Sequence, residues 1–211
     1  LKHASGFLIT NNEQDTYIIT TRSTVSISNE EKNGWMQENG IADEMSNYSV
    51  NTSIRVVVKG DVSSEVTIVN QSENENFVIL KSESVIQEKD CLKIGNSDEL
   101  KGDEIVYSLG FPEQFSENSN AKYTKDEVAV QKGKISNLSL GTNDVDTIMH
   151  YSTIDTGELG GPLLDQNGYV IGLNQKIDGE NAGVYALPIR NIKDILDSYG
   201  IEYGSEELDQ A

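Results

Sequence analysis

The feature that most constrains the fold is a series of short segments rich in β-branched residues, each bounded by turn-forming residues. In the first half these segments are GFLIT, TYIITT, SIRVVVKG, SEVTIVNQ and FVILKSE, and in the second half EIVYSLGFP, EVAVQKGKISNLSLG, DTIMHYSTID, GPLLDQNGYVIGLNQK and AGVYALP. Such segments are typical of strands, and the polar clusters between them are typical of turns. Many short strands with little helix indicate an all-β barrel or sandwich.

Three segments refine this pattern. Asn167-Gly168 separates two apolar runs and predicts a tight β-hairpin. Residues 26–50 are polar and acidic and contain two Asn-Gly pairs, which predicts a long surface loop. Residues 189–199 repeat isoleucine and leucine at helical spacing, which predicts an amphipathic helix that ends at Gly200.

The segment GNSDELKGDE is rich in turn-forming residues and is the expected boundary between two groups of strands. The expected organisation is therefore an N-terminal β-barrel over residues 1–97, including the acidic loop, a C-terminal β-barrel over 98–188, a helix over 189–200, and a tail or linker over 201–211.

Composition excludes several classes of partner and site. The formal net charge is −19, from 35 acidic and 16 basic residues, so the chain repels nucleic acid and anionic membrane surfaces. Cys91 is the single cysteine, which excludes an internal disulfide. The acidic segment NDVD, residues 143–146, lacks the ligand spacing of a known calcium loop, and we expect no metal and no cofactor.

The order of the motifs resembles that of trypsin-like serine peptidases of the HtrA/DegP type. SGFLIT resembles the opening strand of that family, YIITTRSTV the segment with its catalytic histidine, and ENENFVILKSE the segment with its aspartate. KIGNSDELKGDEIVYSLGFP, KGKISNLSL, TGELGGPLLDQNGYVIGLN and GVYALPIRNIKDIL resemble later strands, the nucleophile loop and the final helix. The resemblance covers residues 5–196 and implies two six-stranded antiparallel β-barrels of the trypsin type, followed by a short helix.

Position by position, the resemblance places Ser23 at the family's histidine, Asn76 at its aspartate and Leu159 at its serine. The family's reaction needs a hydroxyl whose proton is taken by an imidazole that a carboxylate orients. Leu159 has no heteroatom, and the neutral alcohol of Ser23 cannot act as the base. The sequence therefore predicts a chain that lacks all three catalytic groups and is not an active protease.

Neither of the two histidines is expected to replace the missing imidazole. His150 lies nine residues before Leu159, where we expect a hydrogen-bonded strand histidine away from the cleft. His3 is expected to be exposed near the start of the chain. A serine–lysine dyad is also disfavoured, because the matching segment offers Arg22, whose guanidinium keeps its proton.

The glycines of TGELGGPL are explained first by a tight backbone path that needs glycine whatever the chemistry. The alternative is that the N–H groups of Gly157 and Leu159 still form an oxyanion pocket. The resemblance further implies that a peptide would add as a strand to β-edge residues Gly172, Leu173, Asn174 and Gln175, with Thr153 as the floor of a side-chain pocket.

Three functions remain open at this point. The leading hypothesis is a pseudoprotease, a trypsin-fold domain that binds a peptide or protein without cutting it. The alternatives are an active serine-type endopeptidase with a rearranged site, and a structural or sensory domain whose cleft has no role. Because the resembling family works outside the cytoplasm, an extracytoplasmic location is expected.

Overall fold

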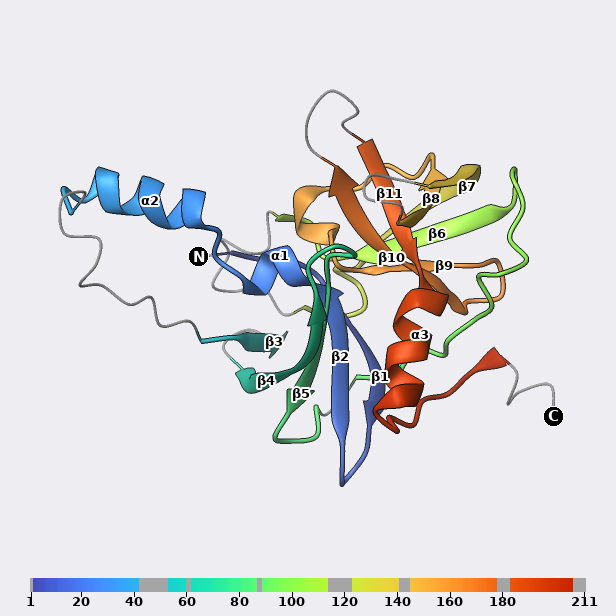
Figure 1. Cartoon of the computed structure of the whole chain (residues 1–211). Coiled ribbons are helices and arrows are strands. Elements are labelled where there is room, and N and C mark those ends of the chain that lie inside the picture. The colour runs from blue at the N-terminus through green and yellow to red at the C-terminus, as the bar shows by residue number, and fades with distance from the viewer. Residues whose placement is uncertain are drawn as a thin grey trace.

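The computed structural model describes residues 2–41, 53–59, 62–86, 89–113, 123–140, 145–177 and 183–206. Two antiparallel sheets lie side by side, with a short helix at the C-terminal end of the chain (Figure 1). The mostly-β fold predicted from the strand pattern is therefore confirmed.

The N-terminal sheet has five strands in the order β1-β2-β5-β4-β3. Their bounds are β1 Phe7–Asn11, β2 Thr16–Thr21, β3 Arg55–Lys59, β4 Val62–Ser72 and β5 Phe77–Ser82. The sequence predicted a closed six-stranded barrel here, but the described residues form one five-stranded sheet. The difference arises between β2 and β3, where the described residues form helices rather than a strand.

The C-terminal sheet closes into the six-stranded antiparallel barrel that was predicted, in the order β10-β11-β8-β7-β6-β9. Its strands are β6 Ile105–Gly110, β7 Ala129–Leu140, β8 Asp146–His150, β9 Pro162–Leu164, β10 Val170–Ile177 and β11 Gly183–Pro188. The predicted hairpin at Asn167-Gly168 joins β9 to β10. The N–H of Asp165 donates to the Tyr169 carbonyl at 2.9 Å, so the turn consists of residues 166–168, with Gly168 at a φ of +89°, and the tight hairpin is confirmed.

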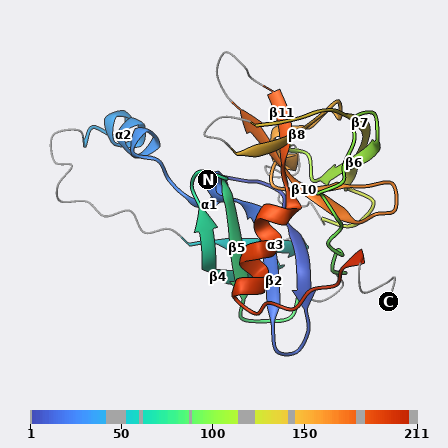
Figure 2. The same ribbon diagram turned by 45° about the vertical axis from the view of Figure 1, so that its right-hand side comes forward.

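Residues 26–50 are not simply a loop, because α1 (Arg22–Val25) leads into α2 (Asn29–Glu38). The side chain of Ser28 accepts the N–H of Glu31, whose carboxylate accepts the N–H of Ser28, so a complete capping box starts α2. Helix α2 points away from both sheets, and its Trp35 is 59% exposed (Figures 1 and 2). The rest of the expected loop, residues 42–50, lies outside the described residues.

The predicted C-terminal helix is present as α3 (Ile189–Ser198). It buries Ile189, Ile192 and Leu196 in a core that also takes Phe7 and Phe77 from the N-terminal sheet and further residues from β10 and β11. Residues 201–206, expected to start a tail, instead lie along the body, because Ile94 donates its N–H to Gly204 and accepts that of Glu206. One core thus joins both halves and fixes the cleft between them.

Candidate functional site

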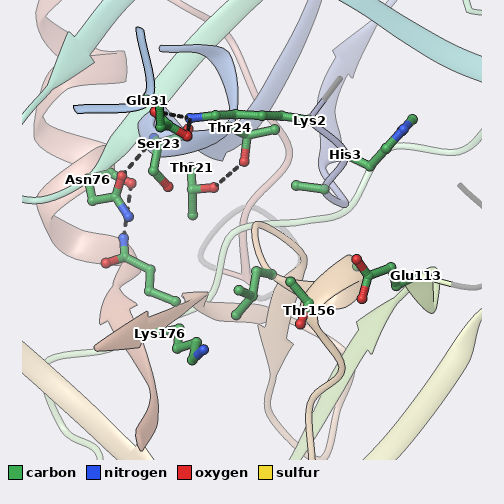
Figure 3. Close-up of a pocket in the computed structure, with 14 residues that line it drawn as sticks. Lys2, His3, Thr21, Ser23, Thr24, Glu31, Asn76, Glu113, Thr156 and Lys176 are labelled. Carbon is green, nitrogen blue, oxygen red and sulfur yellow. Dashed lines mark hydrogen bonds and ion pairs between the residues drawn. The ribbon is translucent and has the colours of Figure 1, made fainter. Parts of the chain in front are cut away.

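A cavity of about 440 Å³ lies where the two halves meet, and Ser23, Asn76 and Leu159 all line it. Ser23 comes from α1, Asn76 from the turn before β5, and Leu159 from the loop before β9. Figure 3 shows Ser23 and Asn76 on one side of this cavity, with Thr156 across from them. The fold therefore brings the three residues to one place, as expected from the motif order.

Asn76 holds the first turn of α1. Its side-chain oxygen accepts the N–H of Ser23 at 2.9 Å, and its carbonyl accepts the N–H of Arg22 at 3.2 Å. Asn76 has a φ of +52°, a left-handed conformation that asparagine tolerates better than most residues. Its amide is thus committed to the backbone and serves a structural purpose here.

Gln175 ties the two halves together at the cavity. Its side-chain nitrogen donates to the carbonyls of Glu75 at 2.8 Å and Asn76 at 3.2 Å. The sequence predicted Gln175 only as part of a peptide-binding edge, and nothing in its surroundings indicated this side-chain contact. The contact between the halves at this point is therefore made by neutral amide and carbonyl groups.

The Leu159 loop does not offer the expected oxyanion pocket in this conformation. The N–H of Gly157 donates to the Asp155 carboxylate at 2.9 Å, and the N–H of Leu159 donates to the Thr156 carbonyl at 3.3 Å. Residues Thr156–Glu158 form a 3₁₀ turn, η4, which Asp155 and Glu158 close with a capping box. In this conformation both N–H groups are occupied, which favours the structural explanation of the glycines over the alternative of an oxyanion pocket. The Asp-x-x-Glu spacing was the available signal for the η4 turn.

Glu158 lies next to Leu159 and is buried, with only 2% of its surface exposed. Burial raises the pKa of this carboxyl, the N–H of Asp155 partly opposes the rise, and the Asp155 charge adds to it. A raised pKa favours the protonated carboxylic acid over the carboxylate. The Glu158 carboxyl accepts the N–H of Asp155, which closes the η4 turn, and it is turned away from solvent.

The structural explanation of the two adjacent glycines is correct. Gly160 has a φ of +83°, and a Cβ on Gly161 would lie 2.0 Å from the Leu109 carbonyl oxygen. Two backbone hydrogen bonds of 2.9 Å hold the loop there. The N–H of Gly160 donates to the carbonyl of Asn174, and the N–H of Asn174 donates to the carbonyl of Gly161. Close backbone packing between β6 and β10 therefore requires glycine at this point.

The predicted peptide-binding edge is misplaced by several residues. Gly172 and Leu173 pair with β9 on one side and β11 on the other, so an added strand cannot bind them. The main chain of Asn174 is hydrogen-bonded to Gly160 and Gly161, and its side-chain nitrogen donates to the carbonyl of Pro162. Of the residues predicted for peptide binding, only Gln175 lines the cavity, while Thr153 is exposed and lies outside it.

His3 is exposed, as expected, whereas His150 lacks, within the described part of the chain, the hydrogen bonds that were expected of it. His3 lines the cavity, although Figure 3 shows its ring turned away from Ser23 and Thr24. His150 is buried inside the second barrel, as expected, but neither ring nitrogen has a hydrogen-bond partner among the described residues. Burial lowers its pKa to about 4, and the nearby Asn174 side chain opposes this fall without reaching hydrogen-bond geometry.

Lys2 connects the N-terminal segment to the cavity wall. Its ammonium donates to the carbonyls of Ser23 at 2.9 Å and Ser26 at 2.7 Å and lies 2.7 Å from a Glu31 carboxylate oxygen. The hydrogen bond from Lys2, followed by the N–H of Ser28, lowers the pKa of Glu31 to about 2. No pattern in the sequence links residues so far apart.

We expect Lys2→Met to raise the pKa of Glu31 from about 2 towards its ordinary value of 4.5, because the largest cause of the lowered value is removed. The N–H of Ser28 remains, so the return should be incomplete. The carboxyl carbon chemical shift of Glu31, followed by NMR during an acid titration, measures this pKa. Lys32→Met is the control, and an unchanged Glu31 titration in Lys2→Met would contradict the assignment.

No group of three or more histidine, cysteine or acidic side chains is arranged to hold a metal ion within the ranges described above. Residues 143–144 of the acidic segment considered for calcium fall outside those ranges. Across the same ranges, no helix combines the length and apolar composition required to span a bilayer.

The fold and motif order define a peptidase-type domain, and comparison with known proteins identifies its family. The chain belongs to the trypsin-like peptidase domain family, whose pattern matches residues 4–173. It is 29% identical to serine protease HTRA4 of Homo sapiens over 148 residues, which are 69% of this chain and 29% of that protein. It is 28% identical to the probable periplasmic serine endoprotease DegP-like of Pseudomonas fulva, over 63% of this chain and 26% of that protein.

Protease Do-like 5 of Arabidopsis thaliana is 27% identical over 157 residues, which are 70% of this chain and 46% of that protein. The chain thus spans less than half the length of these relatives. The crystal structure of Deg5 superimposes with a TM-score of 0.60 and 20% identity, covering 94% of this chain and 83% of that one. At this identity the superposition supports the trypsin-like fold alone.

Proposed function

We propose that this domain binds an extended peptide or protein segment in its cleft and does not hydrolyse it. The observation that carries the proposal is that Ser23, Asn76 and Leu159 line one cavity, and these are the residues that the order of the motifs aligns with the family's triad. A leucine cannot attack a carbonyl, and the side-chain oxygen of Asn76 is bonded to the N–H of Ser23, the residue that stands where the base would be. The cleft keeps its place between the two halves, while the groups needed for proton transfer are replaced.

Peptide binding by strand addition needs main-chain hydrogen bonds rather than a catalytic triad. The part of β10 beyond its pairing with β9 begins after Leu173, and its Gln175 and Lys176 line the cavity. We assign the peptide-binding edge to Gln175–Ile177. Since one relative is described as periplasmic, we also propose that this domain works outside the cytoplasm.

A rearranged hydrolase is the second candidate, because the His3 imidazole and the hydroxyls of Ser23 and Thr24 line the same cavity. General-base catalysis requires the imidazole to reach the hydroxyl within hydrogen-bond distance. The His3 ring is turned away from these hydroxyls, and the hydroxyl of Thr24 is hydrogen-bonded to that of Thr21 at 2.8 Å (Figure 3). These contacts favour binding over catalysis.

Thr156→Trp should weaken peptide binding, because Thr156 lines the cavity and a tryptophan there would occupy part of it. Peptides are first enriched from an unbiased library on the wild-type domain. Their affinities for the wild type and the variant are then measured by fluorescence polarisation. We expect Thr156→Trp to weaken binding by about tenfold or more, since the peptide loses a contact surface of several side chains.

Thr153→Trp is the matched control, since Thr153 is exposed and lies three residues away outside the cavity. It should bind as the wild type does. Failure to enrich any peptide would favour the structural or sensory alternative. Loss of binding in Thr153→Trp but not in Thr156→Trp would show that the peptide lies elsewhere.

A further inference from the structure

The outer face of the second barrel carries an exposed row of apolar and basic side chains. Ile135 and His150 are paired and both point inward, so the residues that alternate with them point outward. On β7 these outward residues include Val130, Lys132 and Lys134. On β8 and just beyond it they are Met149 and Tyr151, and the N–H of Tyr151 donates to the Lys134 carbonyl.

The apolar members of this row are unusually open to solvent for strand residues. Tyr151 is 77% exposed, Val130 59% and Met149 43%. They lie on neighbouring strands of one barrel wall, on the side of the barrel away from α2 (Figures 1 and 2). Met149 and Tyr151 are neighbours on this face, and Val130 lies further along β7. Exposed apolar side chains that lie side by side are typical of an interaction site.

The exposed side chains of this face carry positive charge, in contrast to the rest of the chain. The chain has more than twice as many acidic as basic residues, yet the outward positions of this row carry two lysines and no carboxylate. Tyr151 lies across from Lys134, and Lys132 is the next outward residue along β7. The ion pair of Lys134 with Asp103 is long, at 3.9 Å, and exposed. An ion pair that is this exposed and this long contributes little to stability, so Lys134 can pair with a carboxylate of another molecule instead.

We propose that this face, defined by Val130, Lys132, Lys134, Met149 and Tyr151, binds an acidic polypeptide segment that also carries apolar side chains. Carboxylates of the segment pair with the two lysines, and its apolar side chains cover Tyr151 and Met149. The face lies apart from the cavity, whose lining includes none of these five residues. The interaction is therefore independent of peptide binding in the cleft.

The test uses the hexapeptide Glu-Leu-Glu-Glu-Leu-Glu as the probe, with its glutamine analogue as the uncharged reference. Titration followed by amide chemical shifts should show binding that localises to β7 and β8 and weakens with added salt. Lys132→Glu/Lys134→Glu should weaken it by about tenfold, since two attractive pairs become repulsive. Tyr151→Ser should weaken it at any salt concentration, because the apolar contact is lost.

Lys32→Glu/Lys125→Glu is the control with the same change in net charge, and it should bind as the wild type does. The proposal is overturned if the acidic peptide does not bind, or if both double variants weaken it equally. It is also overturned if the glutamine analogue, or a single-stranded oligonucleotide of equal charge, binds as well. The Thr156→Trp variant should retain this binding, which separates a failure here from a failure of the cleft proposal.

Discussion

Gly161→Ala should destabilise the domain by about 3 kcal/mol or more, among the largest effects of any single methyl group in this protein. The added Cβ would lie 2.0 Å from the Leu109 carbonyl oxygen and 2.9 Å from that of Glu158. Neither atom can move away easily, because Leu109 lies within β6 and Glu158 closes the η4 turn. The free energy of unfolding in urea measures the loss.

Gly102→Ala is the matched control, because no atom lies within 4 Å of the Cβ that it adds. It should leave the free energy of unfolding nearly unchanged. If Gly161→Ala does not fold, limited proteolysis beside the control gives the same comparison. Equal stability of the two variants would mean that the close packing between this loop and β6 is not as described.

Acidification should destabilise the fold through His150 by about 3 kcal/mol, from the difference between its folded and ordinary pKa. The folded pKa is about 4 and the ordinary value is 6.5. Between these values the unfolded chain binds a proton that the folded chain excludes. The contribution is therefore fully present above pH 6.5 and is lost progressively as the pH falls to about 4.

The carboxylates also respond to pH, so the effect is measured as a difference between variants. His150→Gln removes the titrating ring, and the free-energy gap between it and the wild type should shrink by about 3 kcal/mol on acidification. His3→Gln makes the same change of residue type at an exposed position and is measured beside it. A gap that is constant with pH would show that the His150 ring is solvated.

The strands and the closed second barrel could be predicted because their signals are local. Val106, Ile148 and Ile171 lie in runs of β-branched residues, and the helix α3 repeats its apolar residues at helical spacing. Helix α2 was missed because its sequence has no apolar face, and polar stretches with Asn-Gly pairs usually form loops. Ser28-x-x-Glu31 was the one signal that pointed to a helix start.

The candidate site was predicted only in part. Motif order placed Ser23, Asn76 and Leu159 correctly at one cavity, because order along the chain determines topology. It could not show which hydrogen bonds each group makes. The contacts of Lys2 with Ser26 and of Gln175 with Asn76 join distant parts of the chain, and the spacing of residues carries no information about them.

We propose that the cleft of this trypsin-like domain does not carry out the hydrolysis that is typical of its family. The most direct measurement is intact-mass spectrometry after incubation with an excess of a fluorophosphonate, with active trypsin as the positive control. We expect trypsin to gain one phosphonyl group per molecule, and we expect this domain to keep its unmodified mass. Stoichiometric modification of this domain, mapped to Ser23 or to any other hydroxyl of the cavity, would contradict it.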